Sequence, residues 1–234
     1  MSTRTDGNIG NDKARWALVL AAALSLGLWF VPGAQYALYP IRFFVTLVHE
    51  GGHAVATVAT GGQVESITVF ANANGVTMSR GGYYFLICMA GYLGATLFGA
   101  TALLMSRRKG AGKRGLLLMG ALTLLVTGLW VHPIPHPFGF LMGLIVTGLL
   151  LAGARLLPER GAAFAVSFLA VQLCLNSVFD LRDLVWLTTN THAANDAVFM
   201  AQSFGLTPWF WASTWALGAG AILFLTLRVY WRGK

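Results

Sequence analysis

Residues 115–154 read GLLLMGALTLLVTGLWVHPIPHPFGFLMGLIVTGLLLAGA, a stretch that contains no Asp, Glu, Lys or Arg. A helix needs about 20 apolar residues to cross a bilayer, so this stretch is long enough for two membrane-spanning helices. Further uncharged runs occupy residues 16–41, 81–106, 161–179 and 197–227. No soluble core needs this many such runs, and the sequence therefore predicts a membrane protein.

Charged side chains are rare and unevenly placed. They make up 10% of the chain, while hydrophobic residues make up 56%, and soluble domains carry about 25% charged residues. The net charge of +8 comes largely from short basic clusters between the uncharged runs, which is typical of cytoplasmic loops rather than of a nucleic-acid surface. We therefore expect a multi-pass protein of a bacterial cytoplasmic membrane, with the lipid bilayer as a partner and without nucleic acid. The clusters are Arg107-Arg108-Lys109 with Lys113-Arg114, Arg155 with Arg160, and Arg228, Arg232 and Lys234.

The uncharged runs predict an all-α polytopic membrane fold with about six to seven transmembrane helices and one small β-hairpin near the candidate metal site. The polar residues 1–14 are expected to form a disordered tail, and residues 15–234 a single transmembrane domain. The predicted helical segments are residues 15–32, 36–60, 82–105, 115–131, 138–156, 161–188 and 209–230.

The segment between the second and third predicted helices has a different pattern. Residues 64–70 are rich in β-forming side chains, and Asn74-Gly75 leads into a second run of this kind. Asn-Gly flanked by β-branched residues is typical of a β-hairpin turn. We expect residues 64–79 to form two short antiparallel strands that turn near Asn74-Gly75, with an irregular interfacial loop as the alternative.

The sequence His49-Glu50-Gly51-Gly52-His53 is an H-E-x-x-H motif within an apolar helix. Residues four apart lie on one face of a helix, so both imidazoles can reach one metal ion. Glu50 is then placed to act on a water molecule at that metal. Ionisable side chains inside a membrane are unfavourable and usually mark function. The alternative is a set of satisfied polar side chains that pack the helices together.

A second polar stripe lies in the sixth predicted helix. Gln172, Asn176, Asp180 and Asp183 are spaced four, four and three residues apart, which places them on one face of an otherwise apolar segment. Two buried carboxylates need a cation or a proton, and catalytic zinc usually has three protein ligands and a water molecule. Asp180 is the preferred third ligand and Asp183 its substitute, while hydrogen bonding between helices is the alternative function of the stripe.

Several small side chains are interpreted as packing groups. Gly91, Ala95 and Gly99 form a stripe that suits close contact between helices. Cys88 and Cys174 both fall within predicted spans and read as small core residues rather than as a disulfide framework.

Taken together, these motifs resemble those of the site-two-type intramembrane zinc metalloproteases, in particular their peptidase-family-B-like branch. The resemblance covers about residues 40–215. Better-known members carry a Leu-Asp-Gly motif at the third ligand, whereas Asp180 and Asp183 are each followed by Leu. The residues that carry the resemblance are His49-Glu-Gly-Gly-His53-Ala54, the hairpin segment that ends near Gly75, Ala90-Gly-Tyr-Leu-Gly94, Asn176-Ser-Val-Phe-Asp180-Leu-Arg-Asp183-Leu184 and Asn195-Asp196-Ala197.

The motif and the resemblance together imply a zinc metalloendopeptidase that hydrolyses peptide bonds of membrane-anchored proteins or peptides. Zinc would be held by His49, His53 and Asp180, with Glu50 as the general base. Asn176 would donate a hydrogen bond to the oxyanion. Two rival functions are a transporter with a polar intramembrane site and a metal-binding scaffold that cleaves nothing.

Overall fold

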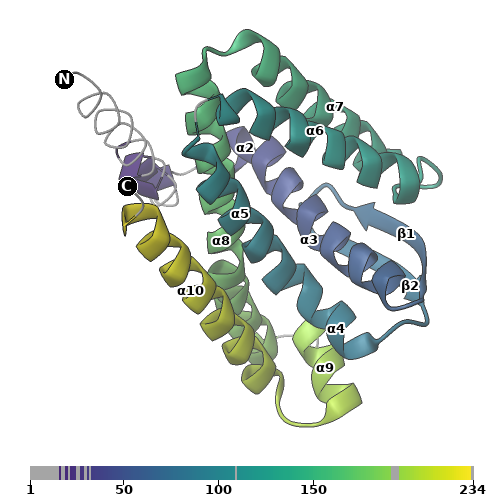
Figure 1. Ribbon diagram of the computed structural model, residues 1–234. Coiled ribbons are helices and arrows are strands. Elements are labelled where there is room, and N and C mark those ends of the chain that lie inside the picture. Colours follow the sequence, from purple (N-terminus) through teal and green to yellow (C-terminus); the bar gives the residue numbers. More distant parts are fainter. Residues whose placement is uncertain are drawn as a thin grey trace.

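The computed structural model describes residues 16, 19–20, 22–24, 27–28, 31, 33–108, 110–190 and 195–232, with the side chains of 34–35 and 176–190 outside the description. Most of the described chain is helical (Figure 1). The helices are α2 (Ala34–Ala37), α3 (Tyr39–Ala59), α4 (Tyr84–Met89), the π-helix η1 (Ala90–Gly94), α5 (Ala95–Ser106), α6 (Ala111–Trp130), α7 (Pro137–Leu156), α8 (Glu159–Asn190), α9 (Asp196–Phe204) and α10 (Pro208–Arg232). The strands are β1 (Gln63–Val69) and β2 (Gly75–Arg80).

Six of the seven predicted helical segments are present, with ends that differ from the prediction by a few residues. The remaining prediction, residues 15–32, falls largely outside the described residues, and the predicted tail at 1–14 falls wholly outside them. Helix α9 is not predicted from the sequence, because its nine residues are too short to give a clear helical periodicity.

Four helical segments of the described chain are long and apolar enough to cross a membrane. The predicted six to seven spans are therefore not confirmed. One physical reason is that α3 carries Arg42, His49, Glu50 and His53, which lower its mean hydropathy. The four segments are Tyr84–Ser106, which joins α4, η1 and α5, and Ala111–Trp130, Pro137–Leu156 and Pro208–Arg232.

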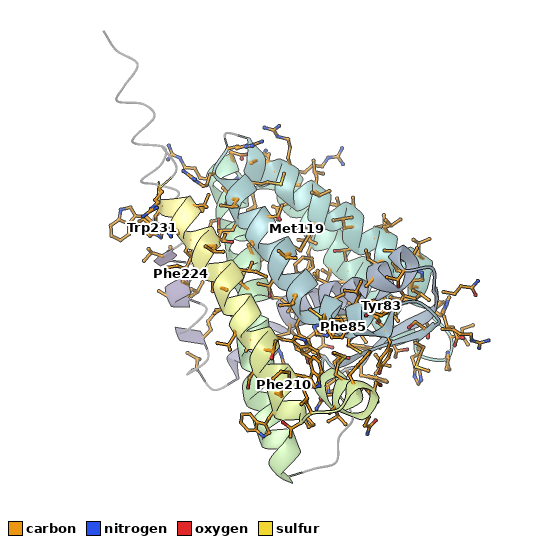
Figure 2. All side chains as sticks on the ribbon, turned by 60° about the horizontal axis from the view of Figure 1, so that its bottom comes forward. Tyr83, Phe85, Met119, Phe210, Phe224 and Trp231 are labelled. Carbon is orange, nitrogen blue, oxygen red and sulfur yellow. The ribbon has the colours of Figure 1, made fainter. Side chains whose placement is uncertain are left out.

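Apolar side chains cover the outside of the helical bundle as well as its core. Phe224 and Trp231 of α10 project away from the other helices (Figure 2) and are exposed, whereas Met119 of α6 is buried. The hydroxyl-bearing side chains of Thr123 and Thr127 are buried on the inner face of α6. An outer surface of this kind suits a lipid environment, where helices pack through small and weakly polar residues.

Helix α3 lies in the middle of the molecule, with the hairpin on one side and α5 on the other (Figure 1). Phe43, Phe44, Leu47 and Ala54 of α3 are almost completely buried in the main hydrophobic core. The helix that carries the H-E-x-x-H motif is therefore held on several sides.

The predicted packing role of the small residues is confirmed for part of the stripe. A β-carbon added at Gly99 would lie 2.8 Å from the carbonyl oxygen of Ala170, so α5 and α8 touch backbone to backbone. Ala95 is buried in the same core, while Gly91 faces the two histidines instead. Cys88 and Cys174 are buried free thiols, as predicted.

The predicted β-hairpin is confirmed. β1 and β2 pair antiparallel, from Gln63 opposite Arg80 to Val69 opposite Gly75. The turn lies near Asn74-Gly75, as predicted, but is centred a few residues earlier. It spans Phe70 to Asn74, with Ala73 in the left-handed region at φ 67°, and Gly75 already belongs to β2.

Candidate metal centre

The two histidines of the H-E-x-x-H motif converge on one point, as their spacing on α3 predicts. The Nε2 atoms of His49 and His53 lie 3.1 Å apart. His49, Glu50 and His53 expose only 9%, 5% and 6% of their surface. Buried polar groups of this kind need partners, because removing them from water without a partner is unfavourable.

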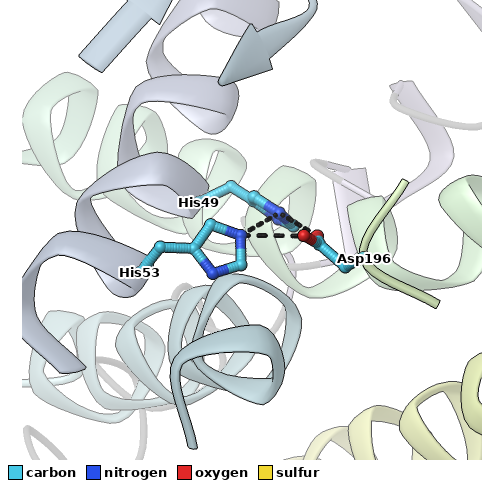
Figure 3. A group of neighbouring side chains, drawn as sticks. All are labelled: His49, His53 and Asp196. Carbon is cyan, nitrogen blue, oxygen red and sulfur yellow. Dashed lines mark hydrogen bonds and ion pairs between the residues drawn. The ribbon is translucent and has the colours of Figure 1, made fainter. Parts of the chain in front are cut away.

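The third member of the group is Asp196, the first residue of α9, as shown in Figure 3. Its Oδ2 atom lies 3.3 Å from Nε2 of His49 and 3.4 Å from Nε2 of His53. The side chain of Asn195 caps α9 by accepting a hydrogen bond from the Val198 N–H at 3.0 Å. This cap fixes the start of α9, and with it the position of the Asp196 carboxylate.

The sequence predicts the third ligand in α8 and assigns no role to Asp196. Asn195-Asp196-Ala197 enters only as part of the family resemblance. An Asn followed by an acidic residue is a typical helix start, and this signal could have predicted α9. Even so, 147 positions separate His49 from Asp196, so their proximity depends on the fold.

The structure does not test the site residues predicted on α8. Asn176, Asp180 and Asp183 lie on a continuous helix, but their side chains are outside the described part of the chain. Their roles therefore stay predictions.

The distances within the group fit one tetrahedrally coordinated ion. Zinc binds histidine nitrogen at about 2.0–2.1 Å, so two tetrahedral ligand atoms should lie about 3.3 Å apart. The three separations in the group are 3.1, 3.3 and 3.4 Å. Two imidazoles and a carboxylate are also a donor set that zinc accepts in catalytic sites.

The orientation of His53 is fixed by a second hydrogen bond. Its Nδ1 lies 2.6 Å from the carbonyl oxygen of Ile87 in α4, where the ring N–H can donate. With the proton on Nδ1, the lone pair of Nε2 points toward His49 and Asp196. Metal-binding histidines usually have such a partner, which sets their tautomer and their direction.

A small space next to the histidines is kept open by Gly91. A β-carbon added at Gly91 would clash with Nε2 of both His49 and His53, the two atoms that would bind the ion. Gly91 lies in the π-helix η1, and π-helical turns are frequent at functional sites. Gly52 of α3 also touches the backbone of Ala90, so that α3 and η1 approach closely around the group.

Asp196 is suited to bind a cation at neutral pH. Burial alone would raise the pKa of its carboxyl group, but the neighbouring imidazoles of His53 and His49 lower it below its usual range. The carboxyl group is therefore ionised at neutral pH, as a metal ligand must be.

Aromatic rings close one side of the group. The ring of Tyr92 meets His49 edge to face, with centroids 4.5 Å apart, and stacks on Trp215 at 5.0 Å. Trp215 itself is buried. These ring contacts hold the His49 imidazole in place.

A family model described as Peptidase M50B-like matches residues 17–226, which is most of the chain. The chain belongs to the Peptidase M50B-like family. The resemblance inferred from the sequence is thereby confirmed, and membership of the M50B-like family together with the four apolar helices indicates an integral membrane peptidase. No curated protein and no solved structure matches this M50B-like chain.

Proposed function

We propose that this M50B-like protein is a zinc-dependent endopeptidase that cuts membrane-anchored proteins or peptides. The observation that carries the proposal is the triangle formed by the buried His49 and His53 with the half-buried Asp196, with the acidic Glu50 next to His49 in the sequence. Two histidines, one carboxylate and an adjacent glutamate are the set of groups that zinc peptidases use.

The proposed roles follow from the chemistry of each group. His49, His53 and Asp196 would hold the ion, which when bound lowers the pKa of a water molecule and polarises the scissile carbonyl. Glu50 accepts the proton of the attacking water and passes it to the leaving amine nitrogen as the C–N bond breaks. Asn176, on α8, is the predicted hydrogen-bond donor to the oxyanion.

The hairpin supports a peptide as the substrate. β2 pairs with β1 along one edge, and an extended peptide can pair with the other edge by strand addition. The exposed side chains of Val76 and Met78 on β2 are apolar, which suits a segment that enters from the membrane. The hydrogen bond from Thr77 of β2 to Glu50 places this strand beside the proposed catalytic base.

Asp196→Asn tests the identity of the third ligand. The amide is nearly isosteric but a much weaker ligand, so we expect zinc affinity to fall by more than about 100-fold, because losing even an outer partner of a zinc ligand lowers affinity by about 10–100-fold. The measurement is zinc content after dialysis against a competing chelator. Asp180→Asn and Asp183→Asn are matched controls on α8. Full zinc retention in Asp196→Asn, with loss in Asp180→Asn, would assign the ligand to α8 instead.

A further inference from the structure

Three side chains, those of Tyr39, Thr46 and Thr77, form hydrogen bonds between one face of α3 and the hairpin. The donors and acceptors on α3 are residues 39, 46 and 50, which are spaced seven and four apart and therefore lie on one helical face. The bonds are Tyr39 Oη to the Phe70 carbonyl at 3.1 Å, Thr46 Oγ1 to the Ala73 carbonyl at 2.8 Å, and Thr77 Oγ1 to Glu50 Oε2 at 2.6 Å. The bonds of Tyr39 and Thr46 attach the hairpin turn to α3, and the bond of Thr77 reaches Glu50 of the candidate site.

Thr77 makes the closest of these contacts. Its hydroxyl lies 2.6 Å from Oε2 of Glu50 and 3.1 Å from the backbone carbonyl oxygen of the same residue. The shorter distance and the negative charge make the carboxylate the stronger acceptor. One hydroxyl therefore touches both the side chain and the backbone of Glu50.

Gly75, two residues before Thr77 on β2, packs against the same Glu50 carboxylate. A β-carbon at Gly75 would lie 2.5 Å from Oε1 and 2.6 Å from Cγ of Glu50. Only glycine lets the strand approach this closely. Gly75 and Thr77 are two residues apart in a strand and so point to the same side, toward α3. Both oxygens of the Glu50 carboxylate thus face β2.

We propose that Thr77 is a positioning residue for Glu50, whose carboxylate its hydroxyl holds by Oε2. This inference rests on the proposed peptidase function for its catalytic part. A glutamate side chain has several rotatable bonds, and a general base displaced by about 1 Å can lose about 100-fold in rate. The hydroxyl of Thr77 removes that freedom. Because Thr77 belongs to β2, the strand proposed to pair with the substrate also sets the position of the base.

The catalytic test compares Thr77→Val, which keeps the shape but removes the hydroxyl, with Thr77→Ser, which keeps the hydroxyl. Thr68→Val is the matched control, because Thr68 lies on the paired strand β1 and faces Val76 across the ladder. The substrate is a single-span peptide with a fluorophore and a quencher, chosen from a library in liposomes because the wild type cleaves it. Zinc content is measured for every variant.

We expect Thr77→Val to lower kcat by about 10–100-fold, with KM changed by less than about twofold and wild-type zinc content. The kcat of Thr77→Ser should lie within about threefold of the wild-type value, and the kcat of Thr68→Val should equal the wild-type value. A wild-type kcat in Thr77→Val, or a Thr77→Ser variant as slow as Thr77→Val, would overturn the proposal. If the wild type cleaves no member of the library, the peptidase function fails, and the hydrogen bond is then judged by stability alone.

The stability test needs no activity. Thr77→Val should lower the melting temperature of the detergent-solubilised protein by about 5 °C, since a hydrogen bond to a charged group is lost. In a Glu50→Ala background the same substitution should have less than half this effect, because only the contact to the backbone carbonyl remains. Equal shifts in the two backgrounds would show that Thr77 does not act through the Glu50 carboxylate.

Discussion

Replacing Glu50 with Gln is expected to abolish cleavage of a membrane-anchored substrate while zinc and the fold are retained. Gln is nearly isosteric with Glu, and its side-chain oxygen can still accept the hydrogen bond from Thr77. It cannot accept a proton from the attacking water. General acid–base groups contribute about 10²–10⁴-fold to the rate, so kcat should fall by at least about 100-fold. The measurement is the cleavage rate in liposomes at equal protein concentration.

The Glu50→Gln comparison needs two checks. Removal of a buried charge can itself stabilise a helical bundle, so wild type and variant are compared in the same detergent with their melting temperatures recorded. Zinc content should be unchanged, because Glu50 is not a proposed ligand. Cleavage by Glu50→Gln at the wild-type rate would contradict the proposed mechanism. A wild type that holds zinc yet cuts no substrate would favour the scaffold function instead.

Gly91→Ala should remove the metal with a single added methyl group. The new β-carbon would occupy the space beside Nε2 of His49 and of His53, where the ion would bind. Alanine favours a helix over glycine by roughly 1 kcal/mol, so weaker helix formation would not explain the loss. We expect zinc affinity to fall by at least about 100-fold, because the loss of a hydrogen-bond partner of a zinc ligand already lowers affinity by about 10–100-fold. The measurement is competition with a fluorescent zinc chelator.

Gly148→Ala is the matched control for Gly91→Ala. Gly148 also lies within a helix, α7, but a β-carbon there meets nothing within 4 Å. This variant should bind zinc as the wild type does. Circular dichroism of both variants separates loss of the ion from loss of the helices. Wild-type zinc affinity in a folded Gly91→Ala protein would place the ion elsewhere.

The helical part of the fold follows closely from the sequence, because long uncharged runs leave few alternatives in a membrane protein. Runs such as 115–154 indicate helices, and their ends can be located from prolines and basic residues. The short helix α9 is different. It spans nine residues, and its position depends on contacts with α4 and α10 rather than on its own periodicity.

The candidate site is only partly predictable for the same reason. His49 and His53 are four residues apart, so local helix geometry brings them together. Asp196 reaches them from a distant part of the chain, and only the packing of α9 decides which of several acidic residues lies nearby. The polar stripe of α8 is the better candidate by periodicity, but periodicity cannot rank carboxylates on different elements.

Gly75 shows how a correct local signal can have another cause. Asn74-Gly75 predicts a hairpin, and the hairpin is present. The turn is nevertheless made by the preceding residues, with Ala73 in the left-handed region. Gly75 is needed because the carboxylate of Glu50 lies against its backbone. Sequence patterns reveal that glycine is required there, but not which neighbour requires it.

The central claim is that His49, His53 and an acidic partner hold one zinc ion in this M50B-like protein. Metal analysis of the purified wild type against His49→Ala tests it most directly. We expect about one zinc ion per wild-type chain and almost none in a folded His49→Ala variant, since catalytic zinc needs three protein ligands. Equal metal content in the two proteins, or a wild type that binds no zinc when zinc is supplied, would contradict it.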